Sequence, residues 1–167
     1  MKIIGTSRLY LREMSLSDAQ SVFELNLDPD VVKYTGDVAF KSIDEVQDFL
    51  INYDHYNKYG FGRWAVIRKS DDEFLGWCGL KFTPELDEYD IGFRFFQKYW
   101  GMGYATEAAK ACIYWAFQNI NMSEIIGRAM PENIASYKVL EKIGLKYFRT
   151  IEMEVGQLLI YKVRNEG

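Results

Sequence analysis

The sequence predicts a single α+β domain over residues 1–167, with a mixed, mostly antiparallel central sheet of about seven strands flanked by about four helices. Its length of 167 residues fits one domain with a buried core of its own. Short apolar runs separated by short polar turns fill the middle of the chain, a pattern typical of antiparallel hairpins. Segments with helical spacing of apolar residues lie before and after that middle, and no linker, repeat or low-complexity stretch divides the chain.

The first elements expected along the chain are a strand and a helix. Residues 8–14 alternate in part between apolar and polar side chains, which predicts the strand. Ser15 and Asp18 have the three-residue spacing of a helix-start capping box, and apolar residues with helical spacing follow them. This helix is expected to end at Asp28-Pro29, because the residue before a proline disfavours helical backbone.

Two further helices are expected before the sheet. A short one covers residues 30–34. A longer one begins at Ser42, has Glu45 in the second position of a capping box, and keeps one apolar face through Tyr56.

The middle and the C-terminal half are predicted to combine a sheet with two more helices. Antiparallel strands are expected over residues 63–69, 74–83 and 88–95. The elements expected after them are a helix over 104–119, a strand over 124–130, a helix over 134–143, and strands over 145–154 and 158–164.

The bulk composition argues against several classes of protein. The formal net charge of −4 and the pI of about 5.1 disfavour a nucleic-acid binder and suit a cationic substrate such as an amine. The lone His55 and the separated Cys78 and Cys112 give no metal-ligand spacing, so we expect no metal and two buried free thiols. Because the N-terminus lacks a signal-peptide pattern and no apolar run approaches a membrane span, we expect a cytoplasmic protein with no membrane partner.

The segment with the clearest chemical meaning is Gly101-Met102-Gly103-Tyr104-Ala105-Thr106, here called the glycine loop, which lies between a predicted strand and a predicted helix. A helix start has unpaired N–H groups and partial positive charge. Glycines let the backbone approach a ligand closely, so the loop predicts an anion site suited to a pyrophosphate. A hydroxyl from Thr106 is available early in the helix.

Other interpretations of the glycine loop are a plain tight turn and a dinucleotide-binding fingerprint. The fingerprint is disfavoured because Thr106 occupies its third glycine position and the preceding strands look antiparallel. A nucleotide P-loop is excluded, since no Gly-Lys-Ser/Thr follows.

Several motifs in a fixed order resemble the GNAT acetyltransferase superfamily, in particular its RimJ/RimL-like branch of ribosomal-protein N-terminal acetyltransferases. The resemblance covers nearly the whole chain. Its segments are residues 6–12, 18–19, 28–34, 90–93, 99–108, 131–136 and 140–145.

The resemblance implies acetyl-CoA as the cosubstrate. Lys98 occupies the Gln/Arg position with which the superfamily loop begins. The backbone amides from Lys98 to Thr106 are expected to bind the pyrophosphate, and the strand end is expected to pair with the pantetheine arm. The cofactor-binding residues implied are Phe95, Phe96, Lys98, Gly101, Met102, Gly103, Tyr104, Ala105, Thr106 and Asn133.

The same resemblance implies Ser136 as the proton donor to the departing thiolate. Many members of the superfamily use a tyrosine further along this helix, but Leu140 holds that position here. Tyr137 is the alternative acid. Asn133 suits an N-cap as well as a coenzyme ligand. Without the resemblance, Ser136 would be interpreted as an ordinary serine in the first turn of a helix.

The general base implied is Asp90, which matches an acidic position common in the branch. The alternative is a solvated strand residue within the acidic run of residues 85–90, which could instead attract a cationic substrate. Glu88 and Glu107 are weaker candidates, and Gln97 cannot act as a base.

The function expected is acetyl transfer from acetyl-CoA to a primary amine, either a peptide N-terminus or a small molecule. A non-catalytic acyl-CoA sensor on the same fold is the alternative. The acceptor surface is expected from the two N-terminal helices, residues 53–61 and the last strands. The resemblance is compatible with a monomer or a homodimer.

Overall fold

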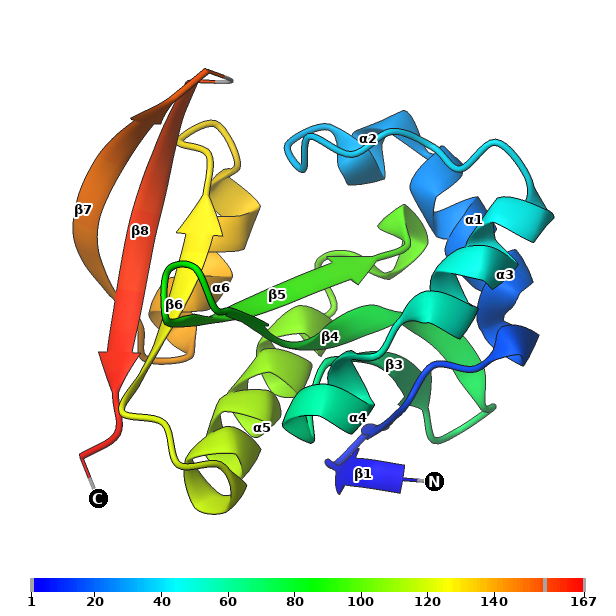
Figure 1. The fold of residues 1–167 in the computed structure, drawn as a ribbon, viewed down its shortest axis with the longest axis horizontal. Helices are drawn as coiled ribbons and strands as arrows, with labels where there is room; N and C mark the ends of the chain where they lie inside the picture. The colour runs from blue at the N-terminus through cyan, green and yellow to red at the C-terminus, as the bar shows by residue number, and fades with distance from the viewer. Residues whose placement is uncertain (1, 155, 167) are drawn as a thin grey trace.

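The computed structural model describes residues 2–154 and 156–166, which form one eight-stranded sheet with helices on both faces (Figure 1). The spatial order is β1-β2-β3-β4-β5-β6-β8-β7, and every neighbouring pair is antiparallel except β5 and β6. The strands are β1 (Lys2–Gly5), β2 (Leu9–Arg12), β3 (Arg63–Arg68), β4 (Glu73–Thr83), β5 (Glu88–Phe95), β6 (Glu124–Ala129), β7 (Lys146–Met153) and β8 (Gly156–Arg164). The predicted mixed, mostly antiparallel sheet is confirmed, with the short β1 as the strand that the sequence analysis missed.

The described residues form six α-helices and two 3₁₀ turns. They are η1 (Leu16–Asp18), α1 (Ala19–Leu27), α2 (Pro29–Val32), α3 (Ile43–Asn52), α4 (His55–Tyr59), η2 (Gln97–Tyr99), α5 (Tyr104–Asn119) and α6 (Ile134–Lys142). None of these helices is long and apolar enough to cross a membrane. The helix predicted from Ser42 to Tyr56 is divided into α3 and α4, because Tyr53 adopts extended backbone where α3 ends.

The predicted helix starts are confirmed. Ser15 and Asp18 form a reciprocal capping box at η1, and the Ser42 hydroxyl accepts a hydrogen bond from the Glu45 N–H. Asp28 ends α1 in extended backbone, as the following proline requires, and its side chain caps α2. Asp18 is buried because Arg12 binds both of its carboxylate oxygens at 2.8 Å.

The two faces of the sheet bury different helices. Trp64 and Val66 of β3 face the larger core, which also takes in the apolar sides of α5 and α6. Ala65 and Ile67, the alternate residues of the same strand, face the smaller core formed with α1 and α3. The period of two in β3 thus divides the molecule into two layers of helices around one sheet.

The parallel pair β5–β6 is the irregular point of the sheet. Its register contains only Asp90 opposite Ile126, which we call the β5–β6 branch point. Beyond it the two strands diverge, as their arrows in Figure 1 show. Helix α6 packs directly on β6, where a Cβ at Gly127 would lie 2.6 Å from the Leu140 side chain. The divergence therefore separates the end of β5 from α6 and leaves space between them.

Candidate active site

A cavity of about 810 Å³ lies between α2, the end of β5, the glycine loop and α6. The lining includes most of the residues that the sequence analysis singled out. These are Phe95, Gly101, Gly103, Tyr104, Ala105, Thr106, Asn133 and Ser136. Asp90, Phe96, Lys98 and Met102 are outside the lining, and Phe96 and Lys98 border a second hollow with Asp28 and Gln97.

The glycine loop presents a row of free backbone donors. Gly101 and Gly103 have φ values of 76° and 82°, in the left-handed region that glycine adopts without a steric cost. The first backbone hydrogen bond of α5 runs from the Glu107 N–H to the Gly103 carbonyl at 3.0 Å. Within the described structure, the amides of residues 101–106 donate no hydrogen bond. Together with the dipole of the 16-residue α5, these amides suit an anion, and their binding of the pyrophosphate stays a prediction.

The loop is attached to the end of β5. The Trp100 indole Nε1 donates to the Phe95 carbonyl at 2.9 Å, and the Phe96 N–H donates to the Leu75 carbonyl at 3.1 Å. These bonds fix where the strand stops and where the loop starts. The contact of a pantetheine arm with Phe95 and Phe96 stays a prediction.

Asn133 and Ser136 meet at the start of α6. The Asn133 Oδ1 accepts the Ser136 N–H at 3.3 Å, so the predicted N-cap is confirmed. The half-buried Ser136 faces the cavity, and its hydroxyl has no hydrogen bond to any described residue. That hydroxyl is therefore available to a ligand atom.

Tyr137, the alternative acid, lies in a different environment. Its ring stacks on Tyr161, with centroids 6.2 Å apart and an interplanar angle of 8°, and it is not part of the cavity lining. The Tyr161 hydroxyl donates to Glu141 at 3.1 Å. Burial, followed by this carboxylate, raises the pKa of Tyr161 to about 12. Of the two neighbouring hydroxyl residues, only Ser136 lines the cavity.

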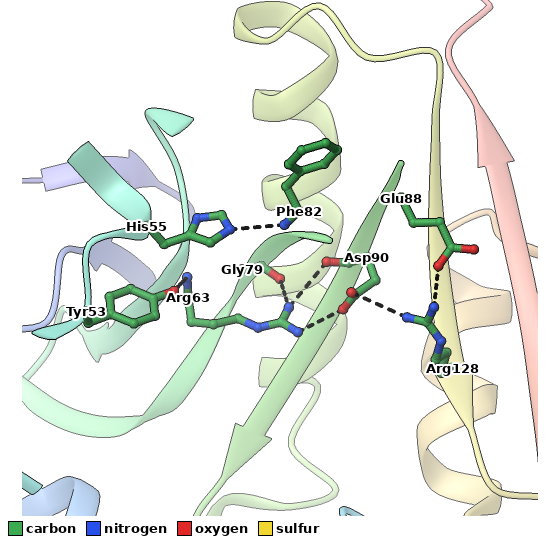
Figure 2. Close-up of polar contacts among 8 residues, drawn as sticks. All are labelled: Tyr53, His55, Arg63, Gly79, Phe82, Glu88, Asp90 and Arg128. Atoms are coloured by element: carbon green, nitrogen blue, oxygen red, sulfur yellow. Dashed lines mark hydrogen bonds and ion pairs between the residues drawn. The ribbon is translucent and has the colours of Figure 1, made fainter. Parts of the chain in front are cut away.

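Asp90 is held between two arginines at the branch point (Figure 2). Its Oδ1 lies 2.8 Å from Nη2 of Arg63, and its Oδ2 lies 3.4 Å from Nη1 of Arg128. Arg63 also donates to the Gly79 carbonyl at 2.7 Å, while Arg128 forms a second ion pair with Glu88.

The burial of Asp90 decides between its two expected environments. The residue is only 8% exposed, so the expectation of a solvated strand residue is wrong. A Cβ at Gly92 would lie 2.7 Å from Nη1 of Arg63, so the glycine makes room for the guanidinium. The charged network joins β3, β4, β5 and β6 where the sheet divides. Its position supports a structural role, and the role of general base stays a prediction.

The carboxylates of Glu88 and Glu107, the weaker base candidates, also form ion pairs with arginines. Glu88 pairs with Arg128. Burial alone would raise the pKa of Glu107, but hydrogen bonds from Thr6 and from the backbone and side chain of Arg8 bring its pKa below the usual value. Gln97 lines the cavity but has no basic group.

The contacts of His55, Cys78 and Cys112 support structural roles for these residues. The Nδ1 atom of His55 lies 2.7 Å from the Phe61 carbonyl, and its Nε2 accepts the Phe82 N–H at 3.0 Å (Figure 2). The Sγ atoms of Cys78 and Cys112 lie 3.8 Å apart as buried free thiols, as expected. No cluster of potential metal ligands occurs among the described residues.

The cavity also contains residues that the sequence analysis did not select. The far wall is formed by five residues in and after α2, namely Asp30, Val31, Lys33, Tyr34 and Thr35. Lys138 and Lys142 of α6 contribute two positive charges. The i, i+4 spacing of these lysines was a usable signal, because it puts both on one helix face. Of the expected acceptor surface, residues 53–61 and the last strands do not line the cavity, and the place where the acceptor binds stays a prediction.

Comparison with known proteins shows the family of the chain. Residues 8–146 match the family described as "Acetyltransferase (GNAT) domain". The chain is 34% identical to the uncharacterized protein YkkB of Bacillus subtilis (strain 168), over 94% of this chain and 92% of the relative. It is 31% identical to the FsC-acetyl coenzyme A-N(2)-transacetylase of Aspergillus fumigatus, over 88% of this chain and 66% of the relative.

The fold is also shared with a solved structure. The acetyltransferase (GNAT family) from Bacillus anthracis superposes with a TM-score of 0.83 and 29% identity, covering 100% of both chains. The sheet does not fit a dinucleotide-binding fold, because β5 and β6, joined by α5, form one parallel pair in an otherwise antiparallel sheet. The chain therefore belongs to the GNAT acetyltransferase family and is an acetyl-CoA-dependent acyltransferase.

Proposed function

We propose that the protein transfers the acetyl group of acetyl-CoA to the nitrogen of a primary amine. The observation that carries the proposal is the row of unpaired amides at residues 101–106, in the same cavity as the free hydroxyl of Ser136. The amides would bind the pyrophosphate, and Asn133 would bind the coenzyme beside it. Ser136 would then lie at the thioester end.

The reaction follows from these positions. A neutral amine attacks the thioester carbonyl carbon, and the tetrahedral intermediate collapses with cleavage of the C–S bond. The hydroxyl of Ser136 passes a proton to the departing thiolate and regains one from water, while the amine nitrogen loses its proton to a base or to water. An α-amine is roughly 10–17% neutral at pH 7, so a peptide N-terminus needs less help from a base than a lysine.

The acceptor is a peptide N-terminus or a small primary amine that enters from the α2 side. Residues 30–31 and 33–35 support this direction, because they face the coenzyme wall across the cavity. The motifs of residues 6–12, 99–108 and 131–136 support membership of the RimJ/RimL-like branch. The fungal relative, named for transfer from acetyl coenzyme A to a nitrogen, supports a small amine equally.

Binding and transfer test this proposal separately. Calorimetric titration should detect acetyl-CoA binding at tens of micromolar or tighter, an affinity of about −6 kcal/mol or better. A panel of peptide N-termini and small amines should then yield an N-acetylated product by mass spectrometry. The absence of binding would overturn the proposal, whereas binding without any acetylated product would indicate an acyl-CoA sensor.

The lysines of α6 should contribute to coenzyme affinity. Replacing both Lys138 and Lys142 by alanine is expected to raise the KM for acetyl-CoA about tenfold, because each exposed ion pair contributes up to about 1 kcal/mol. The dependence of KM on salt concentration should weaken in parallel. Lys110→Ala, an exposed lysine outside the cavity, is the matched control. A KM that stays at the wild-type value would remove the lysines from the coenzyme site.

A further inference from the structure

Arg8, in the turn between β1 and β2, reaches across to the glycine loop. Its Nη1 donates to the Met102 carbonyl at 3.0 Å, and its guanidinium carbon lies 4.3 Å from the centroid of the Tyr104 ring. Its Nε donates to Oε1 of Glu107 at 2.8 Å. One side chain thus contacts the loop, the first residue of α5 and the first turn of that helix.

Glu107 completes this connection from the helix side. Its Oε2 accepts the Thr6 hydroxyl at 2.6 Å and the Arg8 N–H at 2.9 Å. The carboxylate lies near the N-terminus of α5, where negative charge is stabilising. Its lowered pKa means that this stabilisation is fully present above the ordinary glutamate pKa and is lost as the pH falls through the lowered value.

The glycine loop needs such a restraint. Gly101 and Gly103 both have left-handed backbone, and glycine populates many other conformations at little cost. A loop that moved freely would have to lose this freedom when it bound a ligand, which lowers affinity. The hydrogen bond from Arg8 to Met102 fixes the carbonyl between the two glycines, and thereby the direction of the neighbouring amides.

We infer that Arg8 and Glu107 are positioning residues that hold the glycine loop in its anion-binding conformation before the coenzyme arrives. This inference rests on the proposed function, since it takes the pyrophosphate of acetyl-CoA as the ligand of the loop. Arg8 acts through the loop backbone, and its charge is balanced by Glu107. The pair therefore sets the affinity for the pyrophosphate and leaves acetyl transfer itself unchanged.

The test compares acetyl-CoA with acetyl-pantetheine, which carries the thioester without the pyrophosphate. Arg8→Ala and Glu107→Gln are each expected to raise the KM for acetyl-CoA about tenfold, the effect of losing one charge-assisted hydrogen bond. The kcat at saturating acetyl-CoA should stay within about twofold, as should kcat/KM for acetyl-pantetheine. The double variant should resemble each single variant, because both remove the same connection.

Different outcomes would overturn the inference in different ways. Equal losses with both acetyl donors would indicate a general structural role. A raised KM in Arg8→Ala but not in Glu107→Gln would make Arg8 a direct ligand of the anion. Glu107→Gln, which preserves side-chain size, decides the matter if Arg8→Ala does not fold.

The controls separate this inference from the proposed function. Arg149→Ala, at an exposed position of β7, should behave as wild type. Wild-type protein that binds acetyl-CoA, together with variants that bind it equally well, would overturn the positioning role alone. Wild-type protein that binds no acetyl-CoA would overturn the proposed function and this inference with it.

Discussion

Replacement of Ser136 by alanine is expected to lower kcat by about 100-fold while the KM for acetyl-CoA stays within about twofold. The reason is that the hydroxyl, which has no described protein partner, is assigned to the thiolate and not to the coenzyme phosphates. The substitution keeps the backbone N–H that Asn133 caps, so α6 should remain intact. Both kcat and KM are obtained from steady-state rates, which are measured as the decrease in absorbance of the thioester.

Two further variants make the Ser136 result specific. Tyr137→Phe should retain nearly full activity, because that ring stacks on Tyr161 outside the cavity. Ser123→Ala, at an exposed position before β6, controls for the loss of a hydroxyl elsewhere. Loss of activity in Tyr137→Phe with a normal rate in Ser136→Ala would transfer the role of acid to Tyr137.

Replacement of Asp90 by alanine is expected to lower the free energy of unfolding by about 3–5 kcal/mol. The substitution removes the carboxylate between the guanidinium groups of Arg63 and Arg128 and leaves their positive charges close to each other. Urea denaturation at neutral pH measures the change. Glu88→Gln, which breaks a more exposed ion pair of the same network, should cost about 1 kcal/mol or less.

Asp90→Asn tests the predicted role of general base in the same residue. A residue that only holds the branch point should lose stability on this change while kcat/KM keeps the acidic limb of its pH profile. A base should instead lose rate by about 100-fold or more and lose that limb. Because both oxygens face guanidinium groups, the geometry favours the first result. The second result would assign Asp90 to proton removal from the amine.

Local patterns explain why most of the fold could be predicted. The capping pairs Ser15–Asp18 and Ser42–Glu45, and the proline after Asp28, act through neighbouring residues that the sequence displays directly. The strand at residues 2–5 escaped prediction because its four residues are too few for alternation to be recognised. The break at Tyr53 has a tertiary component, since its hydroxyl accepts the N–H of Arg63 in β3.

The candidate site also contains residues that the sequence predicts from local motifs and residues whose contacts it does not predict. The glycine loop and the Asn133–Ser136 pair each lie within a few residues of the chain, so their motifs can be recognised in the sequence. The partners of Asp90 come from strands 27 and 38 residues away, and those of Arg8 lie almost 100 residues later. Pairings at such distances depend on how the sheet assembles, and no local pattern in a single sequence indicates them.

The buried pair Cys78 and Cys112 has a practical consequence. Both thiols are fully buried, and burial together with the neighbouring thiol raises the pKa of Cys112, which suppresses the reactive thiolate. They are the only cysteines of the chain, so the folded enzyme should not react with thiol-specific chromogenic reagents. Coenzyme A released by turnover can then be titrated without background. The slow appearance of two protein thiols per chain would report how often the larger core opens.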